Sequence, residues 1–159
     1  MLFERYDEPM LRWADAGIGQ ADDAFDALLA WVRATSGILN TQHRQFALSK
    51  SQRETNMEVV CGWGDYINKS DCFHEHLNEG FRAGFVGTSD GHRRTPGLGG
   101  GLTGLWVREF TLSGIIDAFR HGRCYATAGA RIGLRLSLNN AFMGEVAPEA
   151  DGYRARVAV

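Results

Sequence analysis

The stretch Gly84-Phe85-Val86-Gly87-Thr88-Ser89-Asp90-Gly91-His92 decides the fold, because a short apolar run passes directly into a polar loop. The slim apolar residues 84–87 predict a strand that is covered on both faces. Asp90 and His92 then offer a carboxylate oxygen and an imidazole nitrogen, the ligands that a divalent metal at a hydrolytic centre binds. A polar turn, with Asp90 accepting backbone hydrogen bonds and His92 in solvent, is an equally open interpretation.

Two further strands precede this one, and each brings a residue that could bind metal. A helix is predicted over residues 21–35, and the short strand after it leads to His43. A second strand, predicted over 57–64, carries Glu58, and a helix over 68–80 follows it. This alternation of strand, loop and helix continues up to about residue 125 and is typical of a parallel sheet or barrel.

Active sites in such folds gather at the carboxyl ends of the strands. His43 and the Asp90/His92 pair lie just past the ends of their predicted strands, whereas Glu58 lies near the start of its own. Histidine and carboxylate side chains converging on one edge build a hydrolytic metal site. We therefore expect His43, Asp90 and His92 to lie within roughly 10 Å of one another.

The pattern changes after Gly129, where apolar residues begin to alternate with polar or small ones. This alternation predicts half-exposed antiparallel strands over residues 132–138 and 153–159. The two strands should form a small separate sheet. The residues expected to face inward are Ile132, Leu134, Leu136 and Leu138.

Composition excludes several classes of function. The net charge of -2 gives no surface for nucleic acid or membrane, so the expected partner is a small-molecule substrate. No apolar run approaches the roughly 20 residues of a membrane span, and the charged N-terminus predicts a cytoplasmic protein. The 3 cysteines lack metal-finger spacing and are predicted to be free thiols in a reducing compartment. The sequence does not predict the oligomeric state.

Several motifs resemble the C-terminal part of PHP-domain metallohydrolases, the polymerase and histidinol phosphatase superfamily. They are Ser89-Asp90-Gly91-His92, Arg94-Thr95-Pro96-Gly97 and the segment 118–132, AFRHGRCYATAGARI. The carbamate-hydrolase-like branch is the most similar, and residues 57–64 also resemble one of its strands. The likeness covers residues 25–145 and implies an α/β fold. That fold is the C-terminal part of a distorted, TIM-like (β/α)7 barrel, followed by the start of a small antiparallel β-sandwich.

The resemblance implies a barrel portion over residues 1–128 and a β-sandwich portion over 129–159. It also implies two or three divalent metal ions, either Zn, Mn or Fe. Asp90 and His92 match the last ligand motif of that family. His43 falls at a histidine-bearing loop of the branch, although Thr41-Gln42 replaces the residues expected before it.

Three other residues could complete such a site. Glu58 matches a glutamate that either binds metal or supports a ligand. Arg93 and Arg94 could hold an anionic group of the substrate bidentately, and an ordinary solvated loop is the open alternative.

The His-x-His motif that opens the PHP family is missing. The chain's only His-x-His is His74-Glu75-His76, in a predicted helix, where residues i and i+2 point apart. We therefore expect the chain to be a fragment of a longer enzyme and inactive alone. The hypothesis for the intact protein is a metal-dependent hydrolase of phosphoesters, esters or carbamates. The rival is a non-catalytic structural domain.

Overall fold

The computed structural model describes residues 28, 30–32, 34–35, 37–41, 54–67, 71–91 and 97–159. The helix predicted over 21–35 is described at five positions, Leu28, Ala30 to Val32 and Ala34, and all are helical. The remaining elements are β1 (Leu39–Thr41), β2 (Glu54–Cys61), β3 (Gly64–Asp65), α2 (Asp71–Asn78), β4 (Gly84–Gly87), β5 (Leu102–Leu105), α3 (Leu112–Arg120), β6 (Cys124–Thr127), β7 (Arg135–Leu138), β8 (Ala141–Phe142) and β9 (Ala155–Ala158).

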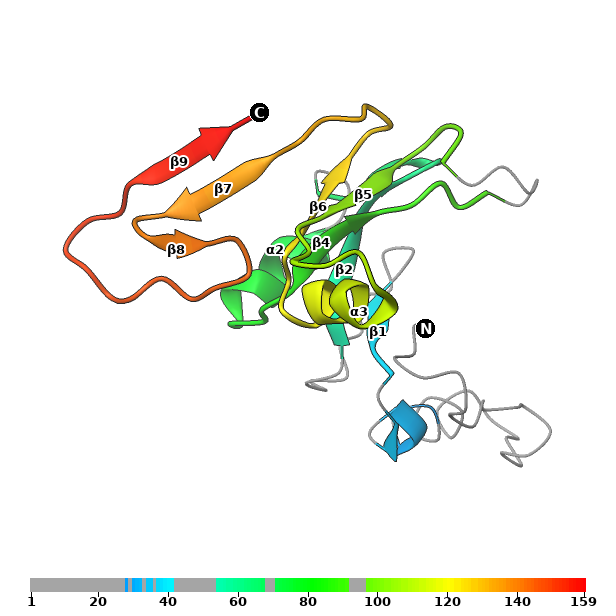
Figure 1. Cartoon of the computed structure of the whole chain (residues 1–159), viewed down its shortest axis with the longest axis horizontal. Helices are drawn as coiled ribbons and strands as arrows, with labels where there is room; N and C mark the ends of the chain where they lie inside the picture. The colour runs from blue at the N-terminus through cyan, green and yellow to red at the C-terminus, as the bar shows by residue number, and fades with distance from the viewer. Residues whose placement is uncertain are drawn as a thin grey trace.

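The strand predicted over residues 84–87 is β4, which lies at the edge of a parallel sheet (Figure 1). β2 lies between β1 and β4 and pairs in parallel with both. The short β3 folds back from β2 and pairs with it antiparallel. The parallel arrangement of these three strands was predicted, and it puts their carboxyl ends at one edge of the sheet.

The barrel prediction is wrong, because the strand–helix alternation stops producing parallel strands after β4. β5 and β6 flank α3, yet they pair antiparallel. The backbone N–H of Trp106 donates to the Arg123 carbonyl at 2.9 Å and extends this ladder beyond the two strands. The described residues thus form a β-rich fold of three small sheets, with no TIM-like barrel among them.

One threonine joins the antiparallel β5–β6 pair to the parallel sheet. The Thr103 hydroxyl donates to the Gly87 carbonyl at 2.7 Å and accepts from the Gly87 N–H at 3.0 Å. The backbones also pack directly at this junction, since a Cβ on Gly87 would lie 2.7 Å from the Leu102 carbonyl oxygen. A side chain therefore replaces the backbone ladder between the two sheets.

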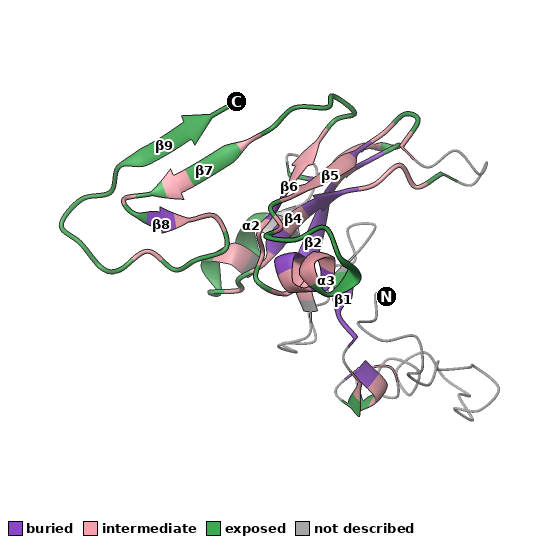
Figure 2. Cartoon of the chain, in the orientation of Figure 1, coloured by how far each residue is buried: buried purple, intermediate pink, exposed green. Residues whose placement is uncertain are grey.

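The core surrounds β2, which is buried on both faces (Figure 2). Successive strand residues point to opposite faces. Met57, Val59 and Cys61 pack on one face with Tyr66. The other face carries two fully buried polar residues, Asn56 and Glu58. Two buried polar side chains are unusual in a strand that is covered on both faces, and their hydrogen-bond partners are described below.

Cys61 and Cys124 lie in the core as free thiols, which confirms the prediction for these two cysteines. Cys61 and Cys124 are both buried. Burial raises the pKa of Cys124 to about 12, and its thiol donates to the Asn56 side-chain oxygen at 3.2 Å. At neutral pH this thiol is therefore protonated and acts as a structural group.

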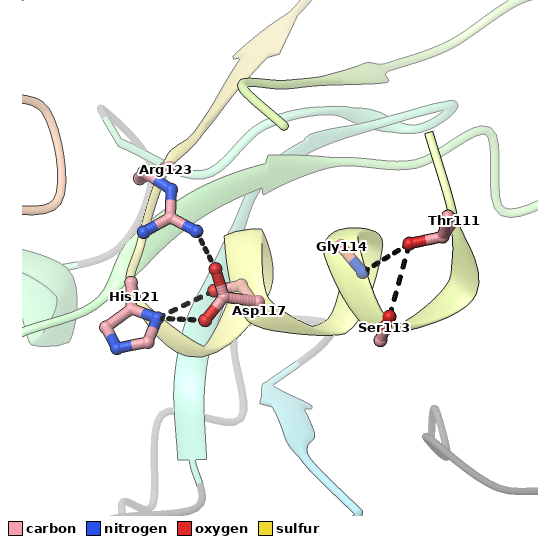
Figure 3. A network of polar contacts seen from close by, with 6 residues as sticks. All are labelled: Thr111, Ser113, Gly114, Asp117, His121 and Arg123. Carbon is pink, nitrogen blue, oxygen red and sulfur yellow. Dashed lines mark hydrogen bonds and ion pairs between the residues drawn. The ribbon is translucent and has the colours of Figure 1, made fainter. Parts of the chain in front are cut away.

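The helix α3 has defined ends (Figure 3) and a buried face. Thr111 is its N-cap, and the Thr111 hydroxyl accepts from the Gly114 N–H at 3.1 Å. Ile116 and Ala118 are fully buried against the sheet. At the carboxyl end, Asp117 bonds His121 at 2.9 Å and also pairs with Arg123. This polar cluster closes the helix near the start of β6.

Asp117→Asn should lower the free energy of unfolding by about 0.5 kcal/mol at pH 7, because the side chain is 47% exposed and solvent screens the pair. Burial alone would raise the pKa of Asp117, but the hydrogen bond and charge of Arg123, together with His121, lower the pKa below its ordinary value. A carboxyl with a lowered pKa stabilises the fold above its unfolded-state pKa. That stabilisation disappears as the pH falls through the folded-state pKa.

Urea unfolding at pH 7 and at pH 2 measures this difference. The Asp117→Asn variant should match the parent protein at the lower pH. Asp151→Asn, a change of the same kind in an exposed loop, should have no effect at either pH. An equal loss of stability at both pH values would mean that the charge of Asp117 is not the cause.

The C-terminal residues form the small antiparallel sheet that the alternation predicted, in the order β8-β7-β9. Arg135 on one face of β7 lies 5.5 Å from the Phe142 ring centroid, and Trp106 meets the same ring edge-on. The predicted inward orientation is wrong for three of the four apolar residues. Ile132, which precedes β7, and Leu136 and Leu138 within it are 46%, 40% and 37% exposed, so their side chains meet solvent.

Candidate functional site

The carboxyl ends of β2 and β4 meet through backbone contacts. The Thr88 N–H donates to the Val60 carbonyl at 3.0 Å, one residue beyond the paired segment. The turn after β2 and the segment after β4 are pressed together, since a Cβ on Gly62 would overlap the Ser89 carbonyl oxygen. This close approach requires glycine, and it places side chains from both strand ends in one region.

Asp90 lies in this region, immediately beyond β4. Its backbone has a φ of 44°, the left-handed conformation that aspartate tolerates better than most residues. Its carboxylate Oδ2 accepts a hydrogen bond from the indole Nε1–H of Trp63, which lies in the turn after β2. Non-glycine residues in this conformation cluster at functional sites, where the surrounding structure maintains them.

Glu58 supplies a second carboxylate from inside the sheet. Its strand begins at Glu54, earlier than predicted, so Glu58 lies past the middle of β2 and not near its start. The side chain is fully buried, and its Oε1 accepts a hydrogen bond from the Thr88 hydroxyl. Burying a carboxylate is costly unless hydrogen bonds or positive charge compensate it.

A phenol and a thiol, which the sequence did not single out, complete the described part of the region. Tyr66 Oη lies 2.7 Å from Cys61 Sγ, and both residues are buried. Burial raises the pKa of Tyr66 well above its ordinary value, and Cys61 and the negative charges of Glu58 and Asp90 raise it further. The two carboxylates therefore both lie within electrostatic reach of one buried phenol.

Sequence signals for this pair existed but were weak. Cys61 and Tyr66 flank the Gly62-Trp63-Gly64 turn, whose glycines mark a reversal of the chain. A reversal there pairs Val60 with Asp65 and brings Tyr66 opposite Val59, whose side chain lies on the same face of β2 as that of Cys61. The predicted strand over 57–64 included this turn, whereas β2 ends at Cys61.

Four of the predicted site residues lie outside the described residues, and their ligand or substrate roles stay predictions. They are His43, His92, Arg93 and Arg94. The predicted proximity of His43 and His92 to Asp90 is likewise untested. Within the described part of the chain, no group of three or more His, Cys, Asp or Glu residues could hold a metal ion.

His74-Glu75-His76 lies on α2, as predicted. His74 and Glu75 are exposed. Among the helices that fall in the described ranges, none has the length and apolar character that crossing a bilayer needs.

Comparison with known proteins gives one family. The family model described as "Protein of unknown function (DUF3604)" matches residues 65–158, which is more than half of the chain. A search of the curated proteins found no match, and a search of the solved structures found none either. The predicted resemblance to PHP-domain metallohydrolases is therefore wrong, because the matching family is a different one and the described residues form no such barrel.

Proposed function

The chain belongs to the DUF3604 family, and we propose that the intact protein is a metal-dependent hydrolase whose site includes the ends of β2 and β4. One observation supports this proposal above the others. Two carboxylates come from neighbouring parallel strands, Glu58 from within β2 and Asp90 from just beyond β4. The Thr88 hydroxyl, two residues before Asp90, donates to Glu58 and so joins the two strand ends. A pair of carboxylates is a donor set that a divalent cation binds.

The side chains present fit a divalent metal by their chemistry. Carboxylate oxygens are hard ligands and suit cations such as Mn²⁺. Asp90 would bind the metal directly. It is half-buried just beyond the end of β4, and its backbone is in the left-handed conformation. Glu58 would either bind the metal or hold a ligand, and the Thr88 hydroxyl would fix its orientation.

When bound, the metal would activate a water molecule that attacks an ester, phosphoester or carbamate. The chain's own residues would exclude bulk solvent and hold protons. Like any phenol, Tyr66 keeps its proton at neutral pH, and burial raises its pKa further, so it is available as a hydrogen-bond donor. The buried Cys61 thiol beside it would orient that phenol.

Removing the metal should abolish hydrolysis, and restoring it should recover the activity. We expect the purified intact protein to bind Mn²⁺ or Zn²⁺, to lose the metal on dialysis against EDTA and to regain it on addition. Elemental analysis measures the occupancy. Release of 4-nitrophenol from aryl phosphate, acetate and carbamate esters measures turnover.

The outcomes separate the proposal from its rival. Hydrolysis that persists after complete removal of metal would contradict the proposal. A non-catalytic domain is the rival, and it is favoured by the lack of a three-ligand group among the described residues. Failure of calorimetry to detect binding of Mn²⁺ or Zn²⁺ would support that rival.

A further inference from the structure

We infer that Trp63 is a positioning residue, which holds the Asp90 carboxylate in place for a metal ion through its indole N–H. The inference rests on the proposed function, because it assigns a role toward the ion that Asp90 would bind. It adds a residue from a second strand end to the site. It also predicts that an aromatic side chain outside the metal's reach sets the affinity of the site.

The first observation is the exposure of this tryptophan. Trp63 is 71% exposed, so its ring contributes little to the hydrophobic core. The apolar neighbours of the turn, Cys61 and Tyr66, are buried beneath it. Packing therefore does not account for a residue of this size at this position.

The second observation is where the polar atom of the ring points. The indole N–H donates to Asp90 Oδ2, 27 residues away along the chain. The backbone of the turn is itself fixed, because the Trp63 N–H donates to Cys61 Sγ at 3.3 Å. The contact of Gly62 with the Ser89 backbone brings the turn against the segment that carries Asp90.

The third observation is the position of Asp90 on the segment after β4. Asp90 lies two residues beyond Thr88, whose backbone is bonded to Val60 and to Gly101, and the indole contact acts on the side chain itself. A carboxylate that binds metal must be held in one orientation, and hydrogen bonds to it from neighbouring groups do this. Loss of such a partner typically lowers metal affinity by roughly 10–100-fold.

Calorimetry with Mn²⁺ tests the inference. Trp63→Phe keeps an aromatic ring and removes the donor, and it should weaken binding by roughly 10–100-fold. Trp106→Phe is the matched control, because the Trp106 indole donates to the Leu134 carbonyl elsewhere in the fold, and its Mn²⁺ affinity should be unchanged.

A second measurement detects the hydrogen bond without metal. The chain has 4 tryptophans, so its ¹⁵N–¹H spectrum should contain 4 indole signals, and that of Trp63 is assigned from the Trp63→Phe spectrum. Asp90→Ala should move the Trp63 signal upfield and leave that of Trp106 in place. An unmoved Trp63 signal would refute the hydrogen bond and the inference with it.

The two proposals fail in different ways. Unchanged Mn²⁺ affinity in Trp63→Phe, together with lost affinity in Asp90→Ala, overturns the positioning role and leaves the proposed function intact. Unchanged affinity in Asp90→Ala overturns the proposed function, and the role of Trp63 is then overturned as well.

Discussion

Asp90→Asn should reduce Mn²⁺ affinity by more than about 100-fold, beyond the range typical of residues that only support a ligand. The loss of metal should remove most hydrolytic turnover. An amide has the size of the carboxylate but not its charge, and a neutral oxygen is a much weaker ligand for a divalent cation. The substitution therefore tests charge alone.

The variant is chosen to preserve the local structure. Asparagine tolerates the φ of 44° at this position, and its side-chain oxygen can still accept from the Trp63 indole. Thermal unfolding should therefore change by no more than a few degrees. His74→Ala, at an exposed position on α2, should keep both metal and turnover. Full metal occupancy in Asp90→Asn would exclude this residue as a ligand.

Gly87→Ala should destabilise the fold by about 3 kcal/mol, which is the upper part of the range for overpacking. The added Cβ would lie 2.7 Å from the Leu102 carbonyl oxygen and 3.0 Å from the Leu102 nitrogen. Both are backbone atoms in β5 and cannot move without disturbing their own pairing. The shift should also break the two hydrogen bonds between Gly87 and Thr103.

Denaturant unfolding, or a fall in Tm of about 6–12 °C, measures this loss. Gly133→Ala is the matched control, because no atom lies within 4 Å of a Cβ added there. That control should be neutral or slightly stabilising, since alanine restricts the unfolded chain. A Gly87→Ala variant as stable as the Gly133→Ala control would show that β4 and β5 separate easily.

The sequence predicted the local elements well where the pattern was periodic or capped. The strand at 84–87 has the predicted bounds, and the helix predicted over 68–80 contains α2. Side-chain alternation predicted the antiparallel partners β7 and β9. These features depend on neighbouring residues, so a short window of sequence contains the information.

The arrangement of the elements could not be predicted in the same way. α3 lies between two strands, which usually signals a parallel crossover, but β5 and β6 pair antiparallel. The choice depends on contacts such as that of Thr103 with Gly87, and these join residues that are 16 positions apart. The inward prediction for Leu136 and Leu138 failed for a related reason, because alternation shows that one face is apolar but not what covers it.

The candidate site was predicted in part. Asp90 and Glu58 were singled out from residue type and position, and the structure places Glu58 within β2 and Asp90 just beyond the neighbouring β4. Trp63 and Tyr66 were missed as site residues, because their roles depend on a chain reversal at Gly62 and on a contact across to the next strand. The spacing of residues in a sequence does not indicate a hydrogen bond from an indole to a distant carboxylate.

The edge strand β9 has a consequence for colloidal behaviour. It pairs only with β7 among the described strands, and all four of its residues are exposed. Such an edge is a template for uncontrolled strand association. Arg154 precedes the strand and Arg156 lies within it, so like charges would be brought together if two such edges approached each other. Salt screens that repulsion, and concentrated stocks should therefore stay clear longest at low ionic strength.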